Sequence, residues 1–262
     1  MIEALLRRDR LVVMGMLFGT AALAWAYLLH GAGMGMSAAD MTRMVYGNHS
    51  VMKPGMTMAA DWSAGYAAVM FTMWWVMMVA MMLPSAAPVV LLAASVNRKA
   101  SPDARPYGSA GAFISGYLLA WGVFSLIATL LQWALQESGL LSSMTFDSRS
   151  PVLAASLLLA AALWQLTPVK QACLRHCRSP VALLVSHHGR PAFATGLAHG
   201  AYCVGCCWFL MLLLFVGGVM NLFWIVALAL LVLVEKLLPR GRTAGLVLAA
   251  VLATSGIYVL IG

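Results

Sequence analysis

The sequence has 262 residues, of which 63% are hydrophobic and only 9% are charged, and its mean hydropathy is +0.90. Soluble domains usually carry about one quarter charged residues, so this composition argues against a soluble domain and predicts a membrane protein. The net charge of +8 fits lysines and arginines held on the cytoplasmic side of a membrane. It therefore does not indicate nucleic-acid binding.

Seven segments are long and apolar enough to be membrane-spanning helices, since a bilayer core needs about 20 apolar residues per helix. The longest charge-free window contains the turn signal GGVMN (217–221) and is divided there into two helices. The expected spans are 11–29, 64–95, 108–135, 151–168, 192–217, 221–238 and 243–261. The second contains Pro84 and Pro88, so either it is one tilted, kinked helix or its second half bends aside. The expected fold class is an all-α polytopic bundle forming a single domain.

Basic residues fix the expected orientation. With the N-terminus inside, thirteen lysines and arginines fall on inner segments and three fall on outer segments. This bias predicts a cytoplasmic N-terminus and a C-terminus outside. The basic start MIEALLRRDR before an apolar run also resembles a signal peptide. A retained first helix is preferred because the run is about one full span long and fits the charge bias.

Methionine is concentrated in the outer loop 30–62 and in the second span. The loop carries seven methionines together with His30 and His49: Met34, Met36, Met41, Met44, Met52, Met56 and Met58. Thioethers bind Cu(I) without forming disulfides, whereas the alternative is an amphipathic segment lying on the lipid. In the second span, Met70, Met73, Met77 and Met81 form a stripe beside Met78 and Met82, which is either a ligand set or adaptable packing.

All five cysteines lie in two groups. Cys173 and Cys177 occupy the inner loop 169–190 near His176, His187 and His188, and their spacing suits a metal or redox pair if the segment is helical. The alternative is two ordinary cysteines in a basic loop. The cytoplasm is reducing, so structural disulfides are not expected.

The fifth span contains the second cysteine group. Helical spacing gathers His199, Cys203 and Cys206 or Cys207 along one face, and this set of soft ligands suits Cu(I) or zinc. The alternative is small residues at a helix contact, which the adjacent Gly196 and Gly200 would favour. Met77 to Met81 and Cys203 to Cys206 are expected near mid-membrane depth.

Glu235 closes the sixth span beside Lys236. It is either an interior proton or ion group or an interfacial end paired with a neighbouring base. No phosphate loop, nucleophile elbow or dinucleotide fingerprint is present in the sequence.

Three motifs resemble a bacterial family known as domain of unknown function 2182, whose members are described as predicted metal-binding integral membrane proteins. They are WWVMMVAMMLPSAAP, TPVKQACLRHCRSP and the run from GLAHGAYCVGCCW to VEKLLPRG, within residues 62–242. The positions that the resemblance carries over are Met77, Met78, Met81, Met82, Pro84, Cys173, Cys177, His199, Cys203, Cys206, Cys207, Trp208, Asn221, Glu235 and Lys236. The resemblance implies metal binding without naming a reaction.

The leading hypothesis is a multi-pass protein of the bacterial inner membrane that binds a soft metal, copper as Cu(I) or alternatively zinc. It would transport the ion or deliver it to a partner, either a metal-donor or metal-acceptor protein or a larger membrane complex. The expected metal ligands are Cys203, Cys206, Cys207, His199, Met77, Met81, Cys173 and Cys177. Two other classes remain open: a membrane-embedded metal-dependent oxidoreductase or a subunit of one, and a structural or assembly subunit without metal. No catalytic residue is assigned.

Overall fold

The computed structural model describes residues 2–46, 62–100, 106–143, 145–179, 181, 185, 189–237 and 241–261. These residues are almost entirely α-helical, and their only β-type pairing is an isolated bridge between Leu141 and Ser148. The all-α class is thereby confirmed. The helices, in chain order, are α1 (Ile2–Leu29), α2 (Ala38–Val45), α3 (Ala64–Ala100), α4 (Pro106–Glu137), α5 (Pro151–Leu166), α6 (Pro168–Arg178), α8 (Ala192–Leu212), α9 (Leu214–Gly217), α10 (Leu222–Leu237) and α11 (Gly241–Ile261).

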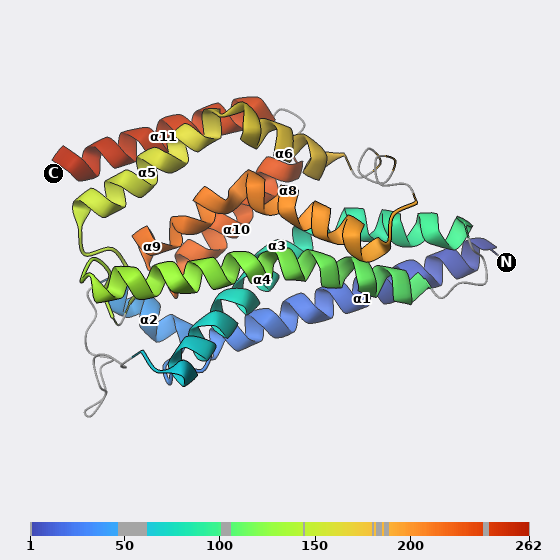
Figure 1. The fold of residues 1–262 in the computed structure, drawn as a ribbon, viewed down its shortest axis with the longest axis horizontal. Coiled ribbons are helices and arrows are strands. Elements are labelled where there is room, and N and C mark those ends of the chain that lie inside the picture. Colours follow the sequence, from blue (N-terminus) through green and yellow to red (C-terminus); the bar gives the residue numbers. More distant parts are fainter. Residues whose placement is uncertain are drawn as a thin grey trace.

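The long helices lie along the longest axis of the molecule and reverse direction from one to the next (Figure 1). Helices α1, α4, α8 and α11 run one way, and α3, α5 and α10 run the other way. The two termini consequently lie at opposite ends of this axis. Helices α5 and α11 pack side by side at one edge of the bundle, away from α1.

Five helical segments in the described residues have the length and apolarity of a membrane span: Arg10–Leu29, Ala64–Ser95, Gly108–Glu137, Ala192–Gly217 and Thr243–Ile261. The bent pair α5 and α6, which meet at 67°, counts as a sixth if it is one broken span. The predicted span 221–238 corresponds to α10, whose 16 residues rise about 24 Å, short of the roughly 30 Å hydrocarbon core. Seven spans therefore stay a prediction.

The overlong second span is one helix. Helix α3 continues for 37 residues with Pro84 and Pro88 in its interior, so its second half does not separate as another element. The GGVMN turn is also present, because α9 ends at Gly217 and α10 begins at Leu222. Gly218 has φ +92° in this turn, a conformation that glycine adopts readily. Asn221 accepts hydrogen bonds from the backbone amides of residues 223 and 224 and so caps α10.

Glycines allow α4 and α8 to approach closely. A Cβ added to Gly196 would lie 1.9 Å from the backbone oxygen of Phe113, and one added to Gly116 would lie 2.1 Å from that of Phe193. At Gly200, an added Cβ would be 2.6 Å from Ala120 Cβ. The packing role suggested by the spacing of Gly196 and Gly200 is therefore present, and it fixes the register of α8 against α4.

The methionines of the predicted outer loop that the structure describes belong to the packed interior. Met41 and Met44 are buried on the short helix α2, and Met34 and Met36 are partly buried against the same core. Ser37 caps α2, and the amide of Leu222 donates to Thr42 Oγ1 (2.8 Å), which ties α2 to the start of α10. His49, Met52, Met56 and Met58 lie outside the described residues.

Candidate metal centre

One face of α8 carries the predicted sulfur and imidazole groups into the bundle interior. His199, Cys203, Cys206 and Cys207 are all buried. The imidazole of His199 stacks on Tyr117 of α4, with ring centroids 5.7 Å apart, and its buried Nδ1 atom has no hydrogen-bond partner among the described residues. The predicted stripe on the fifth span therefore exists and faces protein.

Cys203 lies where four helices meet. Its sulfur is 3.2 Å from the Tyr117 hydroxyl of α4 and accepts from Lys236 Nζ of α10 at 2.9 Å. The same two side chains reach α3: Lys236 donates to Ser85 Oγ (2.8 Å), and Tyr117 donates to the carbonyl of Met82 (3.2 Å). Helices α3 and α8 are therefore linked around Cys203 through a phenol and an ammonium group.

The segment predicted as the inner loop 169–190 is helical in its first half, which is the condition under which Cys173 and Cys177 share one face. Helix α6 is capped by Thr167, with Pro168 as its first residue, an arrangement typical of a helix start. It packs against α8, so Cys173 faces Gly205, where an added Cβ would lie 2.9 Å from its sulfur. His176 stacks on Tyr202, with centroids 4.3 Å apart. His187 and His188 lie outside the described residues.

This packing brings the two predicted cysteine groups together. The sulfur atoms of Cys177 on α6 and Cys206 on α8 are 4.0 Å apart, and all five thiols are free. The thiols of Cys206 and Cys207 both donate to the carbonyl of Cys203, at 3.1 and 3.0 Å. The cysteines predicted in the inner loop and those predicted in the fifth span therefore form one cluster. In this cluster Cys206 is the α8 thiol that faces α6.

The geometry suits an ion held by two thiolates from different helices. Metal–sulfur bonds of about 2.3 Å separate two ligating sulfurs by roughly 3.8 Å at a tetrahedral angle and about 4.6 Å when they lie opposite each other. The Cys177–Cys206 separation of 4.0 Å falls in this range. Among the described residues, no group of three or more His, Cys, Asp or Glu side chains is arranged to hold an ion. Structural zinc normally takes four ligands, whereas Cu(I) is selected by soft thiolates and is stable with two.

The methionine stripe of α3 is buried throughout. Met70, Met73, Met77 and Met81 are at most 4% exposed, and Gln132 Nε2 donates to Met70 Sδ at 3.5 Å. The contacts that join α3 to Cys203 lie at Met82 and Ser85. The cysteine cluster is therefore level with the end of the stripe nearest Pro84.

A cluster of polar side chains lies beside the cysteine cluster, between α5, α6 and α10. Lys170 Nζ donates to both carboxylate oxygens of Glu235 at 2.8 Å and also to Gln165 Oε1, and all three side chains are buried. Arg178 donates to the backbone carbonyl of Glu235. Glu235 is therefore interior and paired, and its partner is Lys170, which is distant in sequence.

Several residues of the site were not predicted from the sequence. Tyr117 and Ser85 carry no local signal in their spans, and Lys170 resembles the surface lysines of an inner loop. Lys236 was noted as a neighbour of Glu235 and as a position that the family resemblance carries over, but not as a partner of the cysteines. A lysine within an apolar run is nevertheless a signal, because an ionised group at membrane depth needs a specific partner.

Comparison with known protein families gave one match. Residues 71–259 match the model of the PpoB2 family, whose description is copper chaperone. This region contains all five cysteines, Met77, Met81, His199 and Lys236. No curated protein matched the chain. No solved structure matched it either.

Proposed function

The chain belongs to the PpoB2 family of copper chaperones, and on that premise we propose that it binds Cu(I) between α6 and α8 within a membrane and delivers the ion to a partner. The observation that carries the proposal is the 4.0 Å approach of the Cys177 and Cys206 sulfurs. Two thiolates supply the soft donors that favour Cu(I). Of the remaining predicted ligands, Cys173, Cys203 and Met81 would act in transfer to and from this pair.

The membrane location is supported by the apolar helices and the positive-inside charge pattern. The alternating helix directions and the termini at opposite ends of the long axis (Figure 1) fit an N-terminus inside and a C-terminus outside. Cys173 and Cys177 on α6 would then lie toward the cytoplasmic side. The resemblance to domain of unknown function 2182 supports the bacterial inner membrane as the location.

Charge balance gives Lys236 a role in this proposal. Binding Cu(I) to two thiols releases two protons and leaves one net negative charge on the site. A negative charge surrounded by apolar helices is costly unless a cation compensates it. The ammonium of Lys236, 2.9 Å from Cys203 Sγ, supplies that cation on the same turn of α8 as Cys206.

Stepwise exchange of sulfur ligands gives a route for delivery. Cys173 and Cys177 are half-buried on α6, whereas Cys206 and Cys203 are fully buried on α8. An ion accepted at α6 would pass to Cys206 through shared ligation and then reach Cys203 one turn away. The last acceptor along α3 would be the Met81–Met82 end of the methionine stripe. An exchangeable site of this kind favours delivery over fixed redox chemistry.

Competition of purified, reduced protein with a Cu(I) chelator of known affinity tests the proposal. Removing one of two thiolate ligands should weaken binding by more than about a hundredfold, since outer-shell partners alone contribute 10–100-fold. We expect this loss for Cys177→Ser and for Cys206→Ser. Cys207→Ser is the matched control, because Cys207 is equally buried and makes the same bond to the Cys203 carbonyl.

Two results would contradict the proposal. The first is wild-type affinity in the Cys177/Cys206 double serine variant. The second is an equal loss in Cys207→Ser, which would make Cys207 a ligand as well and rule out a site formed by Cys177 and Cys206 alone. Zinc in place of copper in the isolated protein would favour the zinc alternative.

A further inference from the structure

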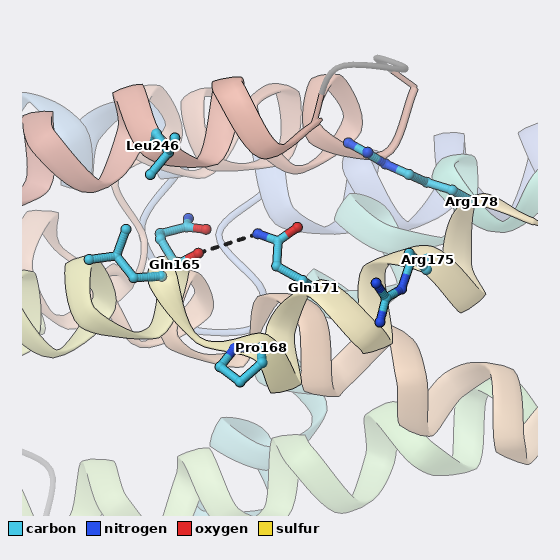
Figure 2. Close-up of a pocket in the computed structure, with 7 residues that line it drawn as sticks. Gln165, Pro168, Gln171, Arg175, Arg178 and Leu246 are labelled. Atoms are coloured by element: carbon cyan, nitrogen blue, oxygen red, sulfur yellow. Dashed lines mark hydrogen bonds between the residues drawn. The ribbon is translucent and has the colours of Figure 1, made fainter.

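A cavity of about 510 Å³ lies at the bend between α5 and α6, where α11 passes over it. Figure 2 shows Gln165 and Gln171 on the α5–α6 side and Leu246 on α11, with Arg178 reaching across toward α11. Arg175 also lines the cavity, and Leu166 forms part of its apolar wall. This cavity is separate from the cysteine pair and has no part in the proposed copper chemistry.

The cavity presents hydrogen-bond donors that lack acceptors. Gln165 is 2% exposed, and its Oε1 atom accepts from the Lys170 ammonium. An ammonium group is only a donor, so this contact fixes the orientation of the amide and leaves Nε2 as the free end. Gln165 Nε2 is buried and has no hydrogen-bond partner among the described residues. A buried unpartnered donor is costly and indicates that an acceptor belongs there.

The two arginines supply positive charge to the same cavity. Arg178 donates from one guanidinium nitrogen to the Glu235 carbonyl, while its Nε is buried and has no hydrogen-bond partner in the described part of the chain. The side chain of Arg175 makes no hydrogen bond or ion pair within the part of the chain that the structure describes. The nearby carboxylate of Glu235 is already paired with Lys170. The cavity therefore has spare donors and spare positive charge, which together favour an anion.

We propose that this cavity binds the phosphate of an anionic membrane lipid. Guanidinium groups bind phosphate oxygens in bidentate fashion, and basic pockets between helices on the cytoplasmic side of membranes bind lipid head groups. Leu166 and Leu246 at the cavity are 55% and 52% exposed, so their apolar surface continues from the cavity onto the outside of the bundle. A lipid satisfies both features, since its phosphate takes the donors and its acyl chains cover the leucines.

The test uses the full chain in neutral detergent, with phosphatidylglycerol as the probe and phosphatidylcholine as the uncharged comparison. Native mass spectrometry of the retained lipid and lipid-induced thermal stabilisation are the two readouts. We expect phosphatidylglycerol to bind in preference to phosphatidylcholine. Arg175→Gln should weaken that binding about fivefold, the effect of one arginine near an anionic lipid. Because the Arg175 side chain has no hydrogen-bond or ion-pair partner among the residues that the structure describes, this variant should fold normally.

Gln165→Glu is the second variant. It keeps an oxygen for Lys170 while removing the Nε2 donor and adding a negative charge, so it should reduce lipid binding more than Arg175→Gln does. Arg190→Gln is the matched control, because it removes one positive charge from an exposed position outside the cavity lining. Unchanged binding in both cavity variants would overturn the proposal. An equal loss in Arg190→Gln would also overturn it by showing nonspecific attraction.

Inorganic phosphate distinguishes a lipid from a free anion. It should compete poorly with phosphatidylglycerol, because it cannot cover Leu166 and Leu246. If millimolar phosphate displaced the lipid fully and stabilised the protein equally without it, the site would be one for a free anion and the lipid assignment would be wrong.

Discussion

Gly196 provides a sharp test of the α4–α8 contact that positions Cys203. In Gly196→Ala the added Cβ would lie 1.9 Å from Phe113 O and 2.7 Å from its carbonyl carbon. Carbon atoms make favourable contacts at about 3.5–4.0 Å, so the helices must separate by roughly 1.5 Å. Both atoms belong to the backbone of α4, so no side-chain rotation relieves the overlap. We expect a loss of stability of about 1–3 kcal/mol, partly offset by the greater helix propensity of alanine.

Gly111→Ala on α4 is the control for Gly196→Ala. An added Cβ at Gly111 meets no atom within 4 Å, so only the propensity gain of about 0.5–1 kcal/mol applies. The assay is the fraction of monodisperse protein that remains after heating in detergent, followed by size-exclusion chromatography. The midpoint of Gly196→Ala should fall below that of wild type, and that of Gly111→Ala should equal or exceed it. Equal midpoints for the two variants would refute the close-packing argument.

Further substitutions probe three separate contacts. Lys236→Met should weaken Cu(I) affinity at least about tenfold in chelator competition. Opposite unit charges 4 Å apart attract by about 4 kcal/mol at the effective dielectric constant typical of a protein, before further solvent screening. An unchanged affinity would remove Lys236 from the site. Lys170→Met should destabilise the fold by about 3–5 kcal/mol, because it leaves the Glu235 carboxylate buried without its cation. The double variant Lys170→Met/Glu235→Leu should recover most of that loss in the same melting assay, and no recovery would contradict the pairing. Asn221→Ala should lower the stability of the protein by about 1 kcal/mol and leave copper affinity unchanged, because Asn221 caps α10. A loss of copper affinity would refute a purely structural role.

The helical class and most element positions follow from composition and charge spacing. Five predicted spans coincide with long apolar helices, and the turn before Leu222 is where the glycine and asparagine pattern placed it. These features depend on local sequence, and a bilayer requires helices wherever an apolar run crosses it. The fourth span was predicted to end at residue 168, but the helix that follows it was not predicted. Thr167 and Pro168 start a new helix, and the direction of α6 depends on its packing against α8.

The candidate site could be predicted only in part, because it too depends on how helices pack against one another. Periodicity groups residues on one helix, so it places His199, Cys203 and Cys206 or Cys207 on a common face of α8. It cannot show that Cys206 faces Cys177, because that contact depends on how α6 docks. The glycine at position 205, which Cys173 approaches, is the only local trace of this docking in the sequence. Lys236 and Tyr117 come from two further helices and could be placed only by the fold.

The most direct test of the central claim is copper K-edge X-ray absorption on protein loaded with one equivalent of Cu(I). We expect a coordination shell of sulfur alone in the wild type, supplied by Cys177 and Cys206. In Cys177→Ser the sulfur count should fall, while in Cys207→Ser it should match the wild type. A shell of nitrogen or oxygen in the wild type, or an unchanged sulfur count in the Cys177/Cys206 double serine variant, would contradict a copper site between α6 and α8.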